Sequence, residues 1–335
     1  MRIGENPTKY ARKSSGKATI PVKISLPLTV CSVTFVPHLE GYYKDGLDIL
    51  KLTFGVLRQT TDQKFDLVVF DNGSCKEVVD WLVLQKENNV IQNLILSSEN
   101  MKKMGAFNAL FSLPLGNRIY YFDSDIYHYS GWLDEMGKVL DIFPEAGLVG
   151  AFHNLPEIDE DSVNNISPEY LVQHGEFVSV AELKTIANSL GADVNDFLDK
   201  KKDQKQIQIT HKGISTLMGA SHCQFLIKKE CVEKIFPKTS EWAATHTDKD
   251  FDFLLKETGY LRLTTSKQYV YHIGNFLEGE WRSKSNKMVE DKGIPLPTVA
   301  SSQTNQHFGM VLKFWPVRKI IIFLYNKLFN LMYRL

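Results

Sequence analysis

The sequence predicts an α/β fold with a mainly parallel sheet, because strand-like and helix-like segments alternate along its first half. Short runs rich in β-branched residues, bounded by turn residues, alternate with segments whose apolar residues recur at helical spacing. Such alternation implies strand–helix–strand units with right-handed crossovers. The 335 residues, 43% of them hydrophobic and 23% charged, have the composition of a globular protein and exclude the disordered, collagen-like and polytopic membrane classes.

The expected elements of the first half follow one another closely. The first strand, 28–36, is rich in β-branched residues and lies between Pro27 and Pro37. The helix after it, 46–59, carries leucine, isoleucine, phenylalanine and valine at helical spacing. The same two patterns then alternate through 65–70 (strand), 75–89 (helix), 90–97 (strand), 101–113 (helix) and 118–125 (strand).

The second half is less regular. The segment 153–212 is expected to be an insertion, in which 179–201 forms two short helices around Gly191. This pair has the outline of a helix-turn-helix, but no basic recognition face accompanies it, so we interpret it as an inserted helical hairpin. The other expected elements are 132–142 (helix), 147–152 (strand), 221–236 (strand, then helix), 248–258 (helix) and 268–275 (strand).

Charge is distributed unevenly, although 39 lysines and arginines balance 39 aspartates and glutamates. Residues 1–24 hold six basic residues and one acidic residue, and 292–335 hold six basic residues and no acidic one. The body between these ends is therefore acidic. The neutral total argues against a dedicated nucleic-acid-binding protein. We expect a basic arm (1–24), one α/β domain (25–290) and a basic tail (291–335).

The cysteines and the N-terminus indicate a reducing compartment. Four scattered cysteines without a C-x-x-C pair do not form a disulfide framework. No apolar stretch follows the charges at the N-terminus, so no secretory signal is expected. The expected location is the cytoplasm.

The tail segment 311–335 predicts an amphipathic helix that does not span a membrane. Its longest uncharged stretch, 320–326, is much shorter than the ~20 residues of a spanning helix. Apolar side chains share one helical face, basic ones share the other, and acidic residues are absent. We expect peripheral contact with the anionic inner face of a membrane. The alternative is a helix packed on the protein's own core or on a partner.

Polar residues follow four of the expected strands, where a parallel sheet binds its ligands. They lie at 37–40, 71–74, 97–100 and 123–125. Because these strand ends meet at one edge of the sheet, we predict a ligand site there and include Pro37, Glu40 and Ser124 among its residues.

An Asp-x-Asp pair ends the fourth strand. Four such pairs occur in the chain, but only Asp123 and Asp125 directly follow a strand-like run at the edge of the predicted sheet. Two carboxylates at this spacing can face one hard divalent cation, with diphosphate oxygens as further ligands. Mg²⁺ or Mn²⁺ suits such a site and would neutralise a departing diphosphate. The pair is also compatible with a solvated acidic turn.

Three further candidates each have a structural alternative. Asp71 and Asn72 can bind a base or a ribose hydroxyl, but Asp-Asn-Gly also forms turns readily. Asp250 lies at a helix start, where a carboxylate acts as a general base or complements the helix dipole. His272 becomes a metal ligand only if a metal site lies nearby; otherwise it is a core residue of a strand.

Taken together, these motifs resemble the inverting family 2 glycosyltransferases of the GT-A fold. The ordered set that carries the resemblance spans about 28–275 and reads FDNGS (70–74), KKMGAFNAL (102–110), YFDSD (121–125), DKDFDFLLKETG (248–259) and YHIGN (271–275).

The resemblance implies a role for each candidate residue. Asp71 and Asn72 would hold the nucleoside, and Lys103 and Asn108 would touch the donor. Asp123 and Asp125 would flank the metal and diphosphate, His272 would be a third metal ligand, and Asp250 would be the general base. Lys249 replaces the usual acid before Asp250, which leaves Asp248 as a second candidate for the base.

The function expected from the resemblance is metal-dependent, inverting transfer of a hexose. The donor would be a nucleotide-sugar, with a UDP-sugar favoured, and the acceptor a lipid-linked or glycan hydroxyl, as in polysaccharide or glycolipid biosynthesis. No Gln-x-x-Arg-Trp motif is present, which argues against a processive synthase. One alternative is a sugar-1-phosphate nucleotidyltransferase, but PHLEGYYKDG (37–46) lacks the Gly-rich basic loop that such an enzyme needs. The other alternative is an inactive scaffold or binding protein.

Overall fold

The structure is a computed structural model that describes residues 26–292, except 114, 156, 157, 159–162, 164 and 165, together with Leu324. The chain divides into two compact units, Met1–Met288 and Val289–Leu335. The predicted arm, 1–24, lies outside the described residues, as does the predicted tail helix apart from Leu324. No helix of the described part combines the length and the apolar character needed to cross a bilayer.

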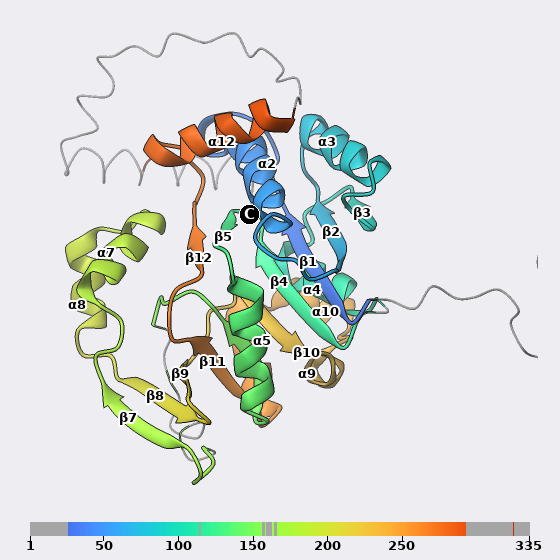
Figure 1. Cartoon of the computed structure of the whole chain (residues 1–335). Coiled ribbons are helices and arrows are strands. Elements are labelled where there is room, and N and C mark those ends of the chain that lie inside the picture. The colour runs from blue at the N-terminus through green and yellow to red at the C-terminus, as the bar shows by residue number, and fades with distance from the viewer. Residues whose placement is uncertain are drawn as a thin grey trace, which may run out of the picture. The chain divides into compact units, whose positions relative to one another are not determined.

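The first unit is built on a ten-stranded sheet with the order β3-β2-β1-β4-β10-β6-β11-β9-β8-β7 (Figure 1). The strands are β1 (Leu28–Thr34), β2 (Asp66–Asn72), β3 (Asn93–Ser97), β4 (Arg118–Asp123), β6 (Ala146–Gly150), β7 (Leu171–Gly175), β8 (Gln206–His211), β9 (Ile214–Met218), β10 (Gln224–Lys228) and β11 (Leu261–Thr265). The first four strands pair in parallel, which confirms the α/β prediction for the half of the sheet that carries the predicted site.

The other half of the sheet is mixed. Strand β10 runs antiparallel to both of its neighbours, and β11 pairs in parallel with β6. The segment 153–212 contributes β7 and β8, which extend the sheet beyond β9 in antiparallel register. Its two helices, α7 (Val180–Ser189) and α8 (Val194–Lys201), are separated by Gly191, as predicted.

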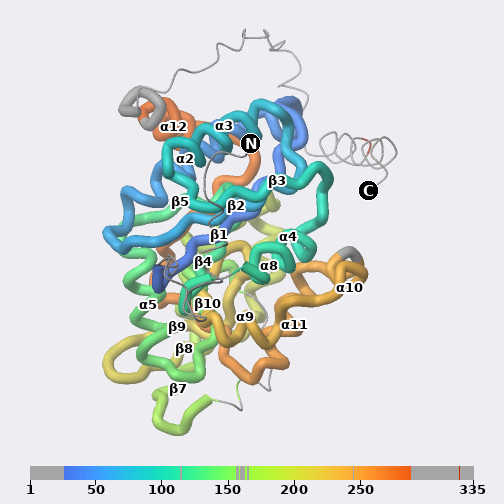
Figure 2. Tube along the Cα trace, turned by 90° about the vertical axis from the view of Figure 1, so that its right-hand side faces the viewer, coloured from blue at the N-terminus to red at the C-terminus, as the bar shows by residue number. Residues whose placement is uncertain are grey.

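Helices cover both faces of the sheet. Helices α2 (Gly46–Leu57), α3 (Lys76–Glu87) and α5 (Trp132–Ile142) pack their apolar sides into one buried cluster on the first face. Helices α4 (Lys102–Phe111), α9 (Lys229–Ile235) and α11 (Asp248–Glu257) share a second cluster on the opposite face (Figure 2). The short helix α10 (Ser240–Thr245) contacts α4. The sheet is therefore packed between two layers of helices.

A separate two-stranded sheet lies beside the main one. Strand β5 (Ile126–His128) follows β4 after a tight turn and pairs antiparallel with β12 (Val270–His272). After β12 the chain continues into α12 (Gly279–Lys292). Arg282 of α12 forms ion pairs with Asp45 and Asp48, at the start of α2. This arrangement brings residues from the end of the unit back to the ends of β1 and β4.

Candidate active site

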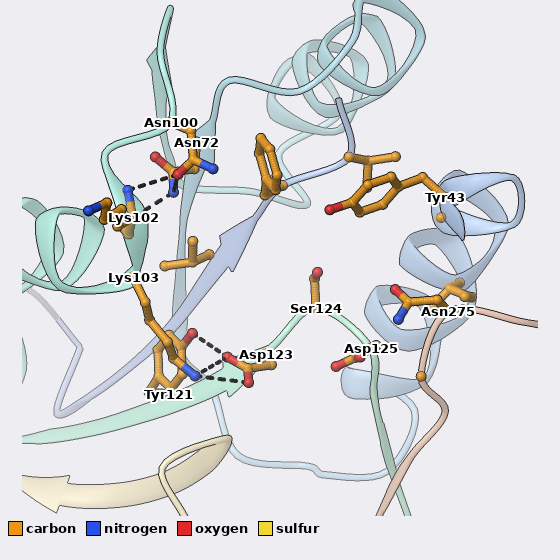
Figure 3. A pocket seen from close by; sticks show the side chains of 16 residues that line it. Tyr43, Asn72, Asn100, Lys102, Lys103, Tyr121, Asp123, Ser124, Asp125 and Asn275 are labelled. Carbon is orange, nitrogen blue, oxygen red and sulfur yellow. Dashed lines mark hydrogen bonds and ion pairs between the residues drawn. The ribbon is translucent and has the colours of Figure 1, made fainter. Parts of the chain in front are cut away.

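A cavity of about 350 Å³ lies at the carboxyl ends of β1, β2 and β4 (Figure 3). Asn72 and Asp123 end two of these strands, and both line the cavity. The start of α4 supplies Lys103, and the segment after β12 supplies Asn275 on the opposite side. Five of the predicted site residues line this cavity: Asn72, Lys103, Asp123, Ser124 and Asp125.

Asp123 is held by two neighbours inside this cavity. The Lys103 ammonium lies 2.9 and 3.0 Å from its two carboxylate oxygens. The Tyr121 hydroxyl donates a hydrogen bond of 2.5 Å to the same carboxylate. Burial favours the neutral form of Lys103, but the Asp123 carboxylate outweighs this effect and raises the Lys103 pKa. The Asp123 carboxylate is therefore already paired with a cationic side chain, the Lys103 ammonium.

Asp125 has a different environment. Its Oδ2 lies 3.2 Å from His272 Nε2, whereas its Oδ1 is buried and has no hydrogen-bond partner among the described residues. Burial raises the Asp125 pKa, and the nearby His272 opposes this shift. The β5–β12 pairing explains the contact, because it sets His272 opposite Ile126, the residue after Asp125. An unpaired buried carboxylate oxygen is costly unless a ligand completes it.

Asp125 and His272 fit a divalent cation as a pair. Among the residues that the structure describes, no group of three or more His, Cys, Asp or Glu side chains is arranged to hold a metal. However, Mg²⁺ and Mn²⁺ sites in enzymes that bind phosphorylated substrates often use one or two protein ligands, with substrate oxygens and water completing the shell. Asp125 offers a free oxygen and His272 an imidazole nitrogen. Asp123, bonded to Lys103 and Tyr121, is less available as a ligand.

Asp71 and Asn72 are the last two residues of β2, and of the two only Asn72 lines the cavity. The Asn72 side chain accepts a hydrogen bond from Met101 N (2.7 Å) and donates one to Asn100 Oδ1 (3.0 Å), which fixes its position on the cavity wall. Asp71 is buried and does not line the cavity, and its Oδ2 accepts from Ser74 N at 3.1 Å. Its Oδ1 is buried without a partner among the described residues.

The other predicted donor-binding residues divide in the same way. Ser124 lines the cavity, and its carbonyl oxygen accepts a hydrogen bond from Thr53 (2.7 Å). Pro37 and Glu40 lie outside the cavity lining. Asn108 also lies outside it, because its amide pairs with the backbone N–H and carbonyl of Lys238, at 2.7 and 3.0 Å. In this structure Asn108 joins α4 to the segment before α10.

Asp250 is partly exposed and caps a helix. It lies in the first turn of α11, where its carboxylate accepts hydrogen bonds from the Thr247 N–H (2.6 Å) and hydroxyl (3.0 Å). The backbone hydrogen bond from Thr247 lowers the Asp250 pKa. The structure does not bring this carboxylate into the cavity lining.

Asp248 also lies outside the cavity lining, but it connects to the cavity through other residues. Its carboxylate lies 3.0 Å from His222 Nε2, and this hydrogen bond lowers the Asp248 pKa to about 2. The backbone carbonyl of His222 lies 3.5 Å from the Lys103 ammonium, which in turn contacts Asp123. Asp248 is therefore the residue of the Asp248/Asp250 pair that lies on the site's network of contacts.

Several lining residues were not predicted from the sequence. Tyr121 carried a usable signal, because a residue two positions before Asp123 in a strand faces the same side. Asn275 is the last residue of the YHIGN motif (271–275), in which only His272 was predicted as a site residue. Lys102 adopts a left-handed backbone (φ 59°) at the start of α4, and the sequence gave no indication of this.

A comparison with known protein families finds a match over part of the chain. Residues 42–177 match the family model described as Glycosyl transferase family 2, a range that includes Asp71 through Asp125. This match supports a glycosyltransferase. No curated protein sequence matches the chain.

Three solved structures show weak similarity. The mannosyltransferase PcManGT from Pyrobaculum calidifontis, in complex with GDP-Man and Mn²⁺, has 14% identity and a TM-score of 0.45 over 88% of this chain and 73% of that one. GalNAc-T7 with UDP, GalNAc and Mn²⁺ has 12% identity and a TM-score of 0.46 over 80% and 48%. TarS 1-349 from S. aureus has 14% identity and a TM-score of 0.38 over 73% and 60%. The similarity thus spans less than two thirds of the length of two of these proteins, and it is too low to transfer a donor or an acceptor.

Proposed function

We propose that this chain is a metal-dependent, inverting glycosyltransferase that moves a hexose from a nucleotide-sugar to an acceptor hydroxyl. The observation that supports this proposal most is the Asp125–His272 pair, in which one buried oxygen of Asp125 has no partner among the described residues. Asp125 lines the cavity at the strand ends. It lies within the residues that match the family model, whereas His272 lies beyond them. We favour a UDP-sugar as donor, a lipid-linked or glycan acceptor, and transfer of one sugar per binding event.

Each residue has a role in this proposal. Asn72, with Asp71 behind it, holds the nucleoside at the end of β2. The Lys103 ammonium, paired with Asp123, places a positive charge where the diphosphate develops negative charge. Asp125 and His272 would hold the divalent cation, which when bound stabilises the departing diphosphate as a Lewis acid.

The transfer step needs a base on the acceptor side. A carboxylate accepts the acceptor's hydroxyl proton as its oxygen bonds to the anomeric carbon, while the bond from that carbon to the diphosphate oxygen breaks. A single displacement of this kind inverts the anomeric configuration. Asp250 was the first choice from the sequence, but its carboxylate caps α11, so we propose Asp248 for this role.

A nucleotide and donor screen tests the proposal. The intact chain would be heated with UDP, GDP or CDP, each with MnCl₂ or with EDTA, and its melting temperature recorded. We expect one nucleoside diphosphate to raise the melting temperature with Mn²⁺ only. The matching nucleotide-sugars, incubated with membrane lipid extracts or oligosaccharides, should release the nucleotide and label an acceptor. Absence of both effects for every nucleotide would refute the proposal.

We also propose that 311–335 binds the cytoplasmic surface of an anionic membrane, although this segment lies outside the described residues except for Leu324. The basic, acid-free amphipathic pattern supports it. A chain lacking 311–335 should move from the membrane fraction to the soluble fraction after ultracentrifugation, while donor hydrolysis in solution is retained. Unchanged fractionation would contradict this proposal.

A further inference from the structure

His222 joins two carboxylates of one helix. It lies between β9 and β10, and its ring faces the first turns of α11. Its Nε2 lies 3.0 Å from Asp248, and its Nδ1 lies 3.2 Å from Asp252. Both ring nitrogens are therefore committed to carboxylates. An imidazole that donates from both nitrogens is the protonated imidazolium.

The cluster of His222, Asp248 and Asp252 contacts two further residues, Arg262 and Lys103. Asp252 also lies 3.0 Å from Arg262 of β11, whose side chain is only 14% exposed. On the cavity side, the His222 carbonyl lies 3.5 Å from the Lys103 ammonium, which holds Asp123. A continuous series of contacts therefore runs from Arg262 of β11, through Asp252 and His222, to Lys103 in the cavity.

The charge of His222 is supported by its surroundings. Burial disfavours the charged ring, but the hydrogen bonds to Asp248 and Asp252 outweigh it and raise the His222 pKa to about 9. The neighbouring Lys103 ammonium opposes this shift. At neutral pH the ring is a cation that fills both its donor positions, so it has no free nitrogen to act as a base itself.

We propose that His222 is a positioning residue for sugar transfer, which fixes the Asp248 carboxylate in the orientation that receives the acceptor's proton. The inference rests on the proposed function and on Asp248 as the base. Without His222, the Asp248 side chain keeps its charge but loses its 3.0 Å partner. A carboxylate that samples several rotamers is aligned with the acceptor for only part of the time, which lowers kcat.

The test compares steady-state transfer by wild type, His222→Ala and His222→Gln. We expect His222→Ala to lower kcat by about 10- to 100-fold while the KM for the nucleotide-sugar stays within about twofold. Gln restores one donor and should recover part of kcat. The control is His174→Ala, because His174 lies exposed on β7, and this variant should match wild type.

A double-mutant cycle shows whether His222 acts through Asp248. In the Asp248→Asn background, His222→Ala should cause no further loss of kcat, because the group that it orients is already gone. Additive losses, or an unchanged kcat in His222→Ala, would overturn the inference while leaving the proposed function intact. If wild type itself transfers no sugar, the proposed function fails and this inference fails with it.

A stability measurement detects the ion pairs independently of activity. Because the folded pKa of His222 is raised, its contribution to stability is fully present below about pH 6.5 and disappears as the pH rises through about 9. The titrating contacts are the Asp248 and Asp252 carboxylates and the Lys103 ammonium. The melting temperature of wild type should exceed that of His222→Gln at pH 6, and the difference should shrink by pH 10. A pH-independent difference would show that the ring is not held as a cation.

Discussion

Replacing Asp125 with asparagine is expected to lower kcat by about 10²- to 10³-fold and to remove the stabilisation by nucleotide and Mn²⁺. The reason lies in the unpaired Oδ1, the one oxygen of the Asp123/Asp125 pair that is buried without a partner in the described structure. An amide in its place has the same shape but is a far weaker ligand for a hard cation.

The same substitution is expected to leave the fold intact. Burial raises the Asp125 pKa, so the charged carboxylate at neutral pH is a net cost to stability. The melting temperature of Asp125→Asn without ligand should therefore equal or exceed that of wild type. Asp199→Asn is the matched control, since Asp199 is 77% exposed and pairs with Lys202, three residues along the chain. Wild-type transfer by Asp125→Asn would contradict the cation site.

Asparagine at position 248 and at position 250 should give opposite results. Asp248→Asn is expected to lower kcat by about 10²- to 10⁴-fold with unchanged nucleotide affinity, because the base is lost but the donor site is not. Asp250→Asn is expected to keep kcat within about twofold and to lower the free energy of unfolding slightly, because it weakens the cap on Thr247.

The measurements are steady-state transfer, nucleotide calorimetry and urea unfolding of both variants. The reverse pattern, with Asp250→Asn inactive and Asp248→Asn active, would restore Asp250 as the base and exclude the role proposed for Asp248. It would also remove the basis of the His222 inference. The two variants share one chemical change two residues apart, so each serves as the other's control.

Much of the fold was predictable because the first half follows simple patterns. Strand β1 and helix α2 were expected at 28–36 and 46–59 and are found at Leu28–Thr34 and Gly46–Leu57. The missed strands had weaker patterns. Every residue of β7 is exposed, so no alternation of apolar and polar residues marks it, and β5 has only three residues.

The residues of the cavity could be predicted where they depend on one strand end, but not where they depend on distant contacts. Asp123 and Asp125 follow directly from their place after β4. The sequence could not show that Lys103 pairs with Asp123, because that pairing depends on how α4 packs against β4. Nor could it show that Asp248 contacts a histidine from another loop, which is the contact on which the proposal of Asp248 over Asp250 rests.

The position of β12 in the chain determines when the Asp125–His272 pair can form during synthesis. All ten strands of the main sheet lie before Lys267, whereas His272 comes after them and reaches Asp125 only through the short pairing with β5. A chain emerging from the ribosome therefore holds every strand of the main sheet before it holds both residues of the proposed cation site. Under the proposed function, a chain that ends before β12 would have the sheet but would lack the cation site that donor binding requires.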